Sequence, residues 1–178
     1  MNRRNFLIKG GTATAALVAG TSIFANIQND FKAKKIINIG VIGTGDRGTG
    51  LIPYINEIEG LNLYACCDVL PFQLERAMKL TDGNVKTYKN HKDLLNDPKV
   101  DAILLTATFS EHYKIGIDAV KASKHIYCEK TMAKGYDGIL DLVKAVKKSD
   151  IIFQTGHQFH SSRLYTHVIQ LIKDGKVG

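Results

Sequence analysis

Hydrophobic positions form two alternating patterns from residue 36 onward. Short runs rich in Ile, Val, Leu and Cys alternate with longer stretches in which apolar residues recur every three or four positions. The short runs are typical of strands buried on both faces, and the longer stretches are typical of amphipathic helices. Strands are expected at 36–42, 61–67, 85–88, 101–106, 125–128 and 151–155, and helices at 47–58, 71–82, 91–96, 110–123, 136–148 and 161–173.

The regular alternation of strand and helix predicts an α/β fold built on a doubly wound parallel sheet of the Rossmann type. No repeat at a solenoid period is present, so one such domain is expected. In a doubly wound sheet the ligand lies over the carboxyl ends of the strands. Polar and ionisable residues follow the apolar runs at those ends, namely at 43–48, 68, 106–112, 129–131 and 156–158.

The first strand runs into three glycines with the spacing G-x-G-x-x-G, at Gly43, Gly45 and Gly48. In a dinucleotide-binding loop the first glycine makes the turn, the second lets a pyrophosphate approach the backbone, and the third lets helix pack on strand. Asp68 ends the next strand about twenty positions later, where a carboxylate binds the ribose hydroxyls. We therefore expect a dinucleotide site rather than a purely structural turn. The other loop residues expected at this site are Thr44, Asp46 and Arg47.

The bulk composition changes this picture little. The 178 residues are 44% hydrophobic and 23% charged, as in ordinary globular domains. The net charge of +7 comes from dispersed lysines and arginines without interleaved aromatic residues, so no nucleic-acid partner is expected. The three cysteines, Cys66, Cys67 and Cys128, lie in predicted strands and are interpreted as small hydrophobic residues rather than as disulfides or a redox pair. His157 and His160 lack a third ligand nearby, so no metal is expected.

Residues 1–30 have the pattern of an export signal rather than of a folded element. Arg3 and Arg4 precede a mildly apolar stretch at 10–25 that is too short and too weakly apolar for a spanning helix. A charged start before such a stretch is typical of bacterial signals, and the paired arginines indicate the twin-arginine route. We therefore expect a signal at 1–30, a dinucleotide-binding domain at 31–178, and a periplasmic protein that is not held in the membrane. A leader on a cytoplasmic protein is the alternative.

Three segments carry a resemblance to the Gfo/Idh/MocA family, the relatives of glucose–fructose oxidoreductase and inositol dehydrogenase. They are V-I-G-T-G-D-R-G at 41–48, D-A-V-K-A-S-K-H-I-Y-C-E-K-T-M-A at 118–133, and T-G-H-Q-F-H-S-S-R-L-Y at 155–165. The resemblance covers about residues 36–178. It implies a Rossmann domain that binds NAD, and Asp68 disfavours NADP because a carboxylate repels the 2′-phosphate. Family members continue into a second α/β domain, which we expect to be absent from this chain.

The same resemblance implies roles for individual residues. Lys130, paired in sequence with Glu129, would lie beside the nicotinamide and the substrate hydroxyl, where it stabilises a developing alkoxide or accepts the hydroxyl proton. His112 is similar to the family histidine that follows the fourth strand and approaches the cofactor, so Lys130 and His112 are the predicted catalytic residues. Thr131 stands where the family has proline. Further cofactor contacts are expected from Thr106, Glu129, His157 and Gln158.

The expected activity is hydride transfer between nicotinamide and a hydroxyl-bearing carbon of a sugar or cyclitol. Two alternatives stay open: a glycoside hydrolase that retains NAD and oxidises its substrate transiently, and a non-catalytic NAD-binding module. The chain length leaves open a fragment, a truncated reading frame or a stand-alone module. The second domain would supply the substrate pocket and any homo-oligomer interface.

Overall fold

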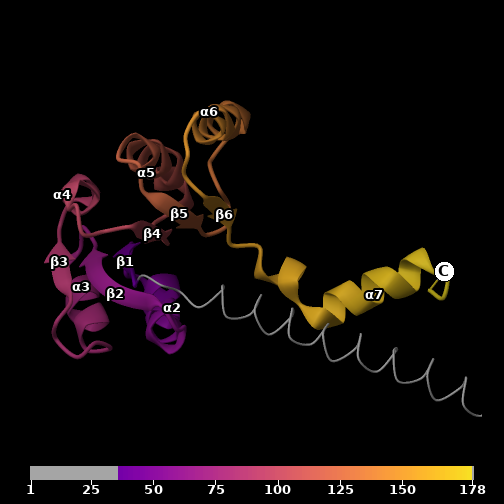
Figure 1. Cartoon of the computed structure of the whole chain (residues 1–178), viewed down its shortest axis with the longest axis horizontal. Helices are drawn as coiled ribbons and strands as arrows, with labels where there is room; N and C mark the ends of the chain where they lie inside the picture. Colours follow the sequence, from indigo (N-terminus) through magenta and orange to yellow (C-terminus); the bar gives the residue numbers. More distant parts are fainter. Residues whose placement is uncertain (1–35, 178) are drawn as a thin grey trace, which may run out of the picture. The chain divides into compact units, whose positions relative to one another are not determined.

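A computed structural model of the chain describes residues 36–177. The chain divides into two units, residues 1–35 and 36–178, and the predicted twin-arginine segment lies outside the described residues. Within the described range strands and helices alternate as the hydrophobic pattern predicts (Figure 1). None of the helices between residues 36 and 177 has the length and apolar content needed to cross a lipid bilayer.

Six strands form one parallel sheet in the order β3-β2-β1-β4-β5-β6. This order confirms the doubly wound Rossmann fold. The strands are β1 (Ile37–Ile42), β2 (Leu61–Cys67), β3 (Lys86–Tyr88), β4 (Ala102–Leu105), β5 (His125–Cys128) and β6 (Phe153–Thr155). The helices are α2 (Asp46–Glu57), α3 (Pro71–Met78), α4 (His91–Asn96), α5 (Phe109–Lys121), α6 (Tyr136–Lys147) and α7 (Arg163–Lys173), with a 3₁₀ turn, η1 (Gln158–Ser161), before α7.

Neighbouring residues of the central strands point to opposite faces of the sheet and build two separate cores. Val41 and Leu104 belong to the core beneath α2 and α3, whereas Ile42 and Leu105 belong to the core beneath α4 and α5. Figure 1 shows α2 and α3 on one side of the sheet and α5 and α6 on the other. Burial on both faces explains why these strands are continuous apolar runs in the sequence.

The crevice between β1 and β4 determines where a ligand can bind. The chain leaves β1 toward β2 and β3 on one side and returns through β4 on the other. The loops after these two neighbouring strands therefore diverge, which opens a crevice at the carboxyl edge of the sheet. The glycine loop after β1 and the turn after β4 line this crevice.

The structure corrects the predicted boundaries near the end of the chain. The helix expected from Ser161 begins at Arg163, because residues 158–161 form η1 and Ser162 has extended backbone angles. The strand expected from Ile151 begins at Phe153, where pairing with β5 starts. No residue of α7 is buried, so its apolar side chains take no part in the two cores.

A buried carboxylate links β2, β3 and the turn after α4. One oxygen of Asp97 accepts hydrogen bonds from Lys86 Nζ (2.9 Å), Tyr88 OH (2.7 Å) and Tyr64 OH (3.2 Å). The other oxygen accepts from the Lys99 backbone N–H at 2.8 Å. The hydrogen bond from Lys86, followed by those from Tyr88 and Lys99, lowers the pKa of Asp97 below its usual range. The charged form is therefore the one that the fold stabilises.

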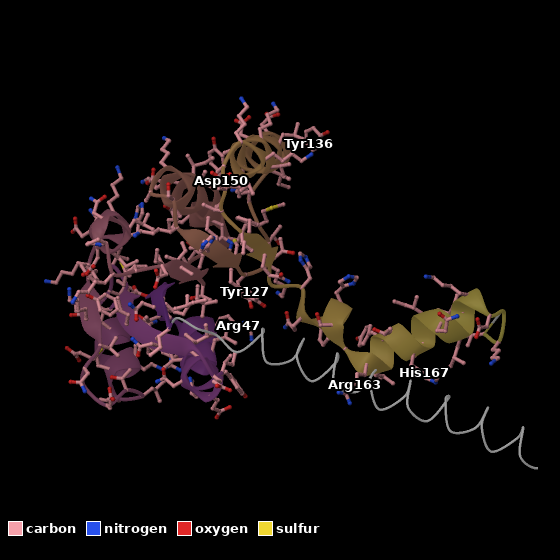
Figure 2. The ribbon with its side chains drawn as sticks, viewed as in Figure 1. Arg47, Tyr127, Tyr136, Asp150, Arg163 and His167 are labelled. Carbon is pink, nitrogen blue, oxygen red and sulfur yellow. The ribbon has the colours of Figure 1, made fainter. Side chains whose placement is uncertain are left out.

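We predict that Asp97→Asn will lower the free energy of unfolding at neutral pH by about 1–3 kcal/mol, because one donor is left facing an amide. A carboxyl whose pKa is lowered on folding contributes stability above its unfolded pKa of about 3.9, and the contribution is lost as pH falls. The difference in the free energy of unfolding between the variant and the unsubstituted protein should therefore become smaller below about pH 4. Urea unfolding at several pH values measures it. Asp150→Asn, at an exposed position (Figure 2), is the matched control, and an equal loss in both variants would contradict the prediction.

Candidate functional site

The glycine loop has the geometry of a phosphate-binding turn. Gly43 has a φ of 93°, and a Cβ there would collide with the backbone of Ala107. A Cβ on Gly48 would collide with the Gly43 carbonyl, so helix and strand pack at this point as predicted. Gly45, in contrast, has no heavy atom within 4 Å of the Cβ position and forms the N-cap of α2 without a side-chain cap. The open space and uncapped N–H groups together suit an anion.

Asp68 is oriented for a ligand by the loop itself. Its Oδ2 accepts hydrogen bonds from the backbone N–H (2.7 Å) and the hydroxyl (3.2 Å) of Thr44. Its Oδ1 accepts from the Leu70 N–H at 3.0 Å. Each carboxylate oxygen can accept more than one hydrogen bond, so acceptor capacity remains for a pair of ribose hydroxyls. Asp68 thus lies at the end of β2 where the sequence predicts it, and it also fixes the loop.

An ion pair joins the glycine loop to the Glu-Lys segment after β5. Arg47 contacts Glu129 Oε1 through both Nε (2.8 Å) and Nη2 (2.5 Å). The Glu129 side chain is 6% exposed and that of Arg47, labelled in Figure 2, is 45% exposed, so the carboxylate is buried while the arginine is partly open to solvent. Glu129 Oε2 also accepts from the Lys130 N–H at 3.2 Å. The two segments, far apart in sequence, are therefore held as one unit.

The side chain of Lys130 is exposed and makes no hydrogen bond or ion pair to any described residue. Its backbone is held by Glu129, and the following peptide to Thr131 is cis. A primary amine on a fixed backbone, free of internal partners, is suited to contact a ligand from solution. The predicted catalytic role of Lys130 is compatible with this placement and stays a prediction.

His112 is buried, with 1% of its surface exposed. Its Nε2 lies 2.8 Å from the Ala107 carbonyl and its Nδ1 lies 2.8 Å from the Thr131 carbonyl. These contacts tie the turn after β4 to the loop after β5. The structure therefore supports a positioning role for His112, whereas the sequence favoured direct approach to the cofactor.

Seven of the predicted site residues line two cavities at the carboxyl edge of the sheet, and the other six line neither, namely Thr44, Asp46, Arg47, Gly48, His112 and Glu129. The first, which we call the loop cavity, has a volume of about 300 Å³ and is lined by Gly43, Gly45, Asp68 and Thr106 among others. The second, which we call the Lys130 cavity, has a volume of about 650 Å³ and is lined by Lys130, His157 and Gln158 among others. The seven lining residues that the sequence assigned to one cofactor site thus divide between two separate cavities.

Two further predicted contact residues, Asp46 and Thr106, also have other partners in the structure. Asp46 is highly exposed, and its Oδ1 lies 2.5 Å from Arg76 Nη1 on α3. Thr106 donates through Oγ1 to the Gly43 carbonyl at 2.6 Å, which closes the loop against β4. Thr106 still lines the loop cavity, whereas Asp46 lines neither cavity. A cofactor contact through Asp46 would need its ion pair with Arg76 to open.

Sequence reasoning missed several lining residues. His91, at the start of α4, lines the loop cavity and lies 2.9 Å from Asp118 through Nε2. Glu111 in the first turn of α5 also lines this cavity. His91 follows β3 at the carboxyl edge of the sheet, and this position after a strand could have identified it as a lining residue from the sequence. Phe159 and Tyr165 line the Lys130 cavity and stack with ring centroids 5.2 Å apart, a contact between η1 and α7 that periodicity does not reveal.

The three cysteines are buried and free. Burial raises the pKa of the Cys66, Cys67 and Cys128 thiols to about 12 each. Protonated thiols are poor nucleophiles, so these positions are structural, as the sequence predicts. Among the described residues no group of three metal-ligating side chains is present.

We predict that no thiol will react with a disulfide reagent at about pH 8 in the native protein, whereas all three cysteines will react in urea. An unfolded cysteine ionises near pH 8.5 and the buried thiols do not, so stability should also fall as pH rises above that value. Thiol titration and alkaline unfolding curves test both statements. Rapid modification of one cysteine in the folded chain would show that its burial is not maintained.

The fold and this edge geometry define a class of protein, the nucleotide-binding Rossmann domains. Residues 37–157 match the Gfo/Idh/MocA family model, described as an oxidoreductase family with an NAD-binding Rossmann fold. The match spans most of the chain, and the chain therefore belongs to the Gfo/Idh/MocA family. The matched region is an NAD-binding Rossmann domain. The open backbone at Gly45 and the acceptor capacity of Asp68 fit that cofactor.

Known relatives extend the comparison. Myo-inositol 2-dehydrogenase of Thermotoga maritima is 33% identical over 142 residues, which are 80% of this chain and 42% of that protein. A glycosyl hydrolase family 109 protein of Shewanella amazonensis is 28% identical over 75% of this chain and 30% of its own length. The crystal structure of Lactobacillus casei myo-inositol dehydrogenase with NAD(H) and myo-inositol superposes with a TM-score of 0.73 at 26% identity, covering 80% of this chain and 43% of that one. The chain thus spans less than half the length of these relatives.

Proposed function

We propose that this chain is the cofactor-binding part of an NAD-dependent oxidoreductase that transfers hydride between nicotinamide and a hydroxyl-bearing carbon of a sugar or cyclitol. The observation that carries the proposal is the ion pair between Arg47 and Glu129. It fixes the backbone of Lys130 next to the loop that receives the pyrophosphate, and the Lys130 side chain is free. An amine in this place can contact the hydroxyl of a substrate that lies beside the bound cofactor.

Different residues of the chain have different roles in such a reaction. Asp68 binds the adenosine ribose hydroxyls, and the N–H groups at the start of α2 bind the phosphates. Bound NAD supplies the hydride acceptor. Lys130 contacts the substrate hydroxyl and either stabilises its alkoxide or takes its proton. His112 holds the loop that carries Lys130 against the turn after β4 through its two carbonyl contacts.

Turnover of a substrate panel tests the proposal. The protein is mixed with NAD and with cyclitols or hexoses, and NADH is followed by absorbance. NADH formation that requires a free ring hydroxyl is the expected result. Myo-inositol is the first choice because the Thermotoga and Lactobacillus relatives are named as inositol dehydrogenases. Bound NAD without NADH formation from any polyol would contradict the proposal.

The similarity to the Shewanella glycosyl hydrolase supports a second candidate, redox-neutral glycoside cleavage with retained NAD. The same Lys130 and Asp68 would serve, because the substrate ring is oxidised and reduced again within one turnover. Release of an aryl group from an aryl glycoside without net NADH would select this candidate. The inositol dehydrogenase relatives are the stronger matches, which favours the first.

Export is a separate proposal. The paired residues Arg3 and Arg4 before an apolar stretch support twin-arginine transport to the periplasm. That route carries folded proteins, so NAD would be loaded in the cytoplasm before export. Replacing both arginines by lysine should retain the protein in the cytoplasm, as measured by cell fractionation. An unchanged distribution would favour a cytoplasmic protein with a leader.

A further inference from the structure

The Lys130 cavity has an unbalanced charge. Lys130, His157 and His160 all line it, and all three side chains carry or can acquire a positive charge. No aspartate or glutamate lines this cavity, whereas Asp68 and Glu111 both line the loop cavity. A surplus of basic groups around a cavity favours an anionic ligand over a neutral polyol.

The nearest carboxylate in sequence does not offset this charge. Glu129 precedes Lys130, but its side chain is 6% exposed and both of its oxygens are engaged, Oε1 with Arg47 and Oε2 with the Lys130 N–H. No ion pair within residues 36–177 involves Lys130, His157 or His160. No carboxylate within residues 36–177 therefore balances the charge of this cavity.

The remaining lining groups suit a hydroxylated ring. Gln154 and Gln158 offer amide donors and acceptors for hydroxyl groups. Phe159 and Tyr165 stack at an interplanar angle of 17° and provide an apolar wall for the carbon face of a ring. The cavity volume of about 650 Å³ lies within the range of small-molecule sites.

We propose that the Lys130 cavity binds a monosaccharide that bears a carboxylate, a sugar acid, in preference to a neutral sugar or cyclitol. This inference rests on the proposed function, because it names the substrate class of the same site. The carboxylate lies among Lys130, His157 and His160, and the ring hydroxyls contact the glutamine amides. Charge-assisted hydrogen bonds to a carboxylate are stronger than those to a neutral hydroxyl, which sets the preference.

Binding to the NAD-loaded chain tests the inference. Isotope-labelled protein is first titrated with NAD and then, at about pH 6, where ordinary histidines are mostly protonated, with D-glucuronate, glucose or myo-inositol. Amide shift changes give the affinity and locate the ligand. Exposed charge pairs are individually weak, so glucuronate should bind about tenfold more tightly than glucose. His160→Gln should reduce that ratio to about threefold, since one of the three cations is lost.

The matched control is His167→Gln on α7 (Figure 2), which does not line the cavity and should leave the ratio unchanged. Equal affinities for glucuronate and glucose in NAD-loaded protein would overturn the inference and leave the proposed function standing. The same holds if His160→Gln and His167→Gln alter the ratio equally. Failure of NAD to bind would instead overturn the proposed function. The two failures are therefore distinguishable.

Discussion

Lys130→Met is expected to slow hydride transfer by about 10²–10⁴-fold, the usual contribution of a positioned acid–base group. Methionine preserves the length and most of the volume of the side chain but cannot hold a proton or a charge. NAD affinity should change by less than about threefold, because the phosphate and ribose contacts come from the glycine loop and Asp68. Pre-steady-state NADH formation measures the chemical step, and fluorescence titration measures the affinity.

The fold should not be affected by this change, since the Lys130 side chain has no partner within the described residues. Lys134→Met, an exposed lysine on the same loop, is the matched control and should retain full activity. Turnover in Lys130→Met at the unsubstituted rate would remove the lysine from the mechanism. It would then leave this chain with a cofactor site but no identified catalytic residue.

Gly43→Ala is expected to lower the free energy of unfolding by about 3 kcal/mol or more. Its φ of 93° lies in a region that alanine rarely adopts, and the added Cβ would collide with the backbone of Ala107. The colliding atoms belong to the backbone, so the collision cannot be relieved by rotating a side chain. Because the crevice between β1 and β4 is built at this turn, NAD binding should be lost together with stability.

Gly45→Ala provides the contrast within the same loop. Its φ of −64° suits alanine and no atom lies within 4 Å of the new Cβ, so stability should change by no more than about 1 kcal/mol. NAD affinity should fall about tenfold, because the methyl group occupies the space through which a pyrophosphate approaches the backbone. Urea unfolding and NAD titration of both variants separate the two roles. Similar effects of the two substitutions would contradict the assignment of a structural role to Gly43 and of a phosphate-binding role to Gly45.

Much of the fold was predictable because local signals agreed with the global arrangement. The limits of β2 at Leu61 and Cys67, of α4 at His91 and Asn96, and of β5 at His125 and Cys128 match the expected ranges. These segments are bounded by residues that stop or start elements, and their apolar runs are continuous. The glycine loop and Asp68 could be identified from spacing alone. The three glycines specify the turn, and Asp68 lies at the expected distance from them, at the end of the next strand.

The parts that sequence did not predict depend on contacts between distant segments. Arg47 and Glu129 are 82 positions apart, and only the sheet order brings the loops after β1 and β5 together. The carbonyl contacts of His112 likewise depend on how α5 packs against the Thr131 loop. The late start of α7 reflects η1, a turn whose residues fit the helical period but whose backbone does not continue it. Periodicity reports local pattern and cannot detect such pairings.

The central claim is that residues 43–68 form a working NAD site on this chain, and calorimetric titration with NAD tests it most directly. We expect one NAD per chain with a dissociation constant on the order of 10 µM, about 7 kcal/mol of binding free energy. Asp68→Ala should weaken binding about 100-fold, because two hydrogen bonds to a charged acceptor are lost. Absence of binding at millimolar NAD, or equal affinity in Asp68→Ala, would contradict the account.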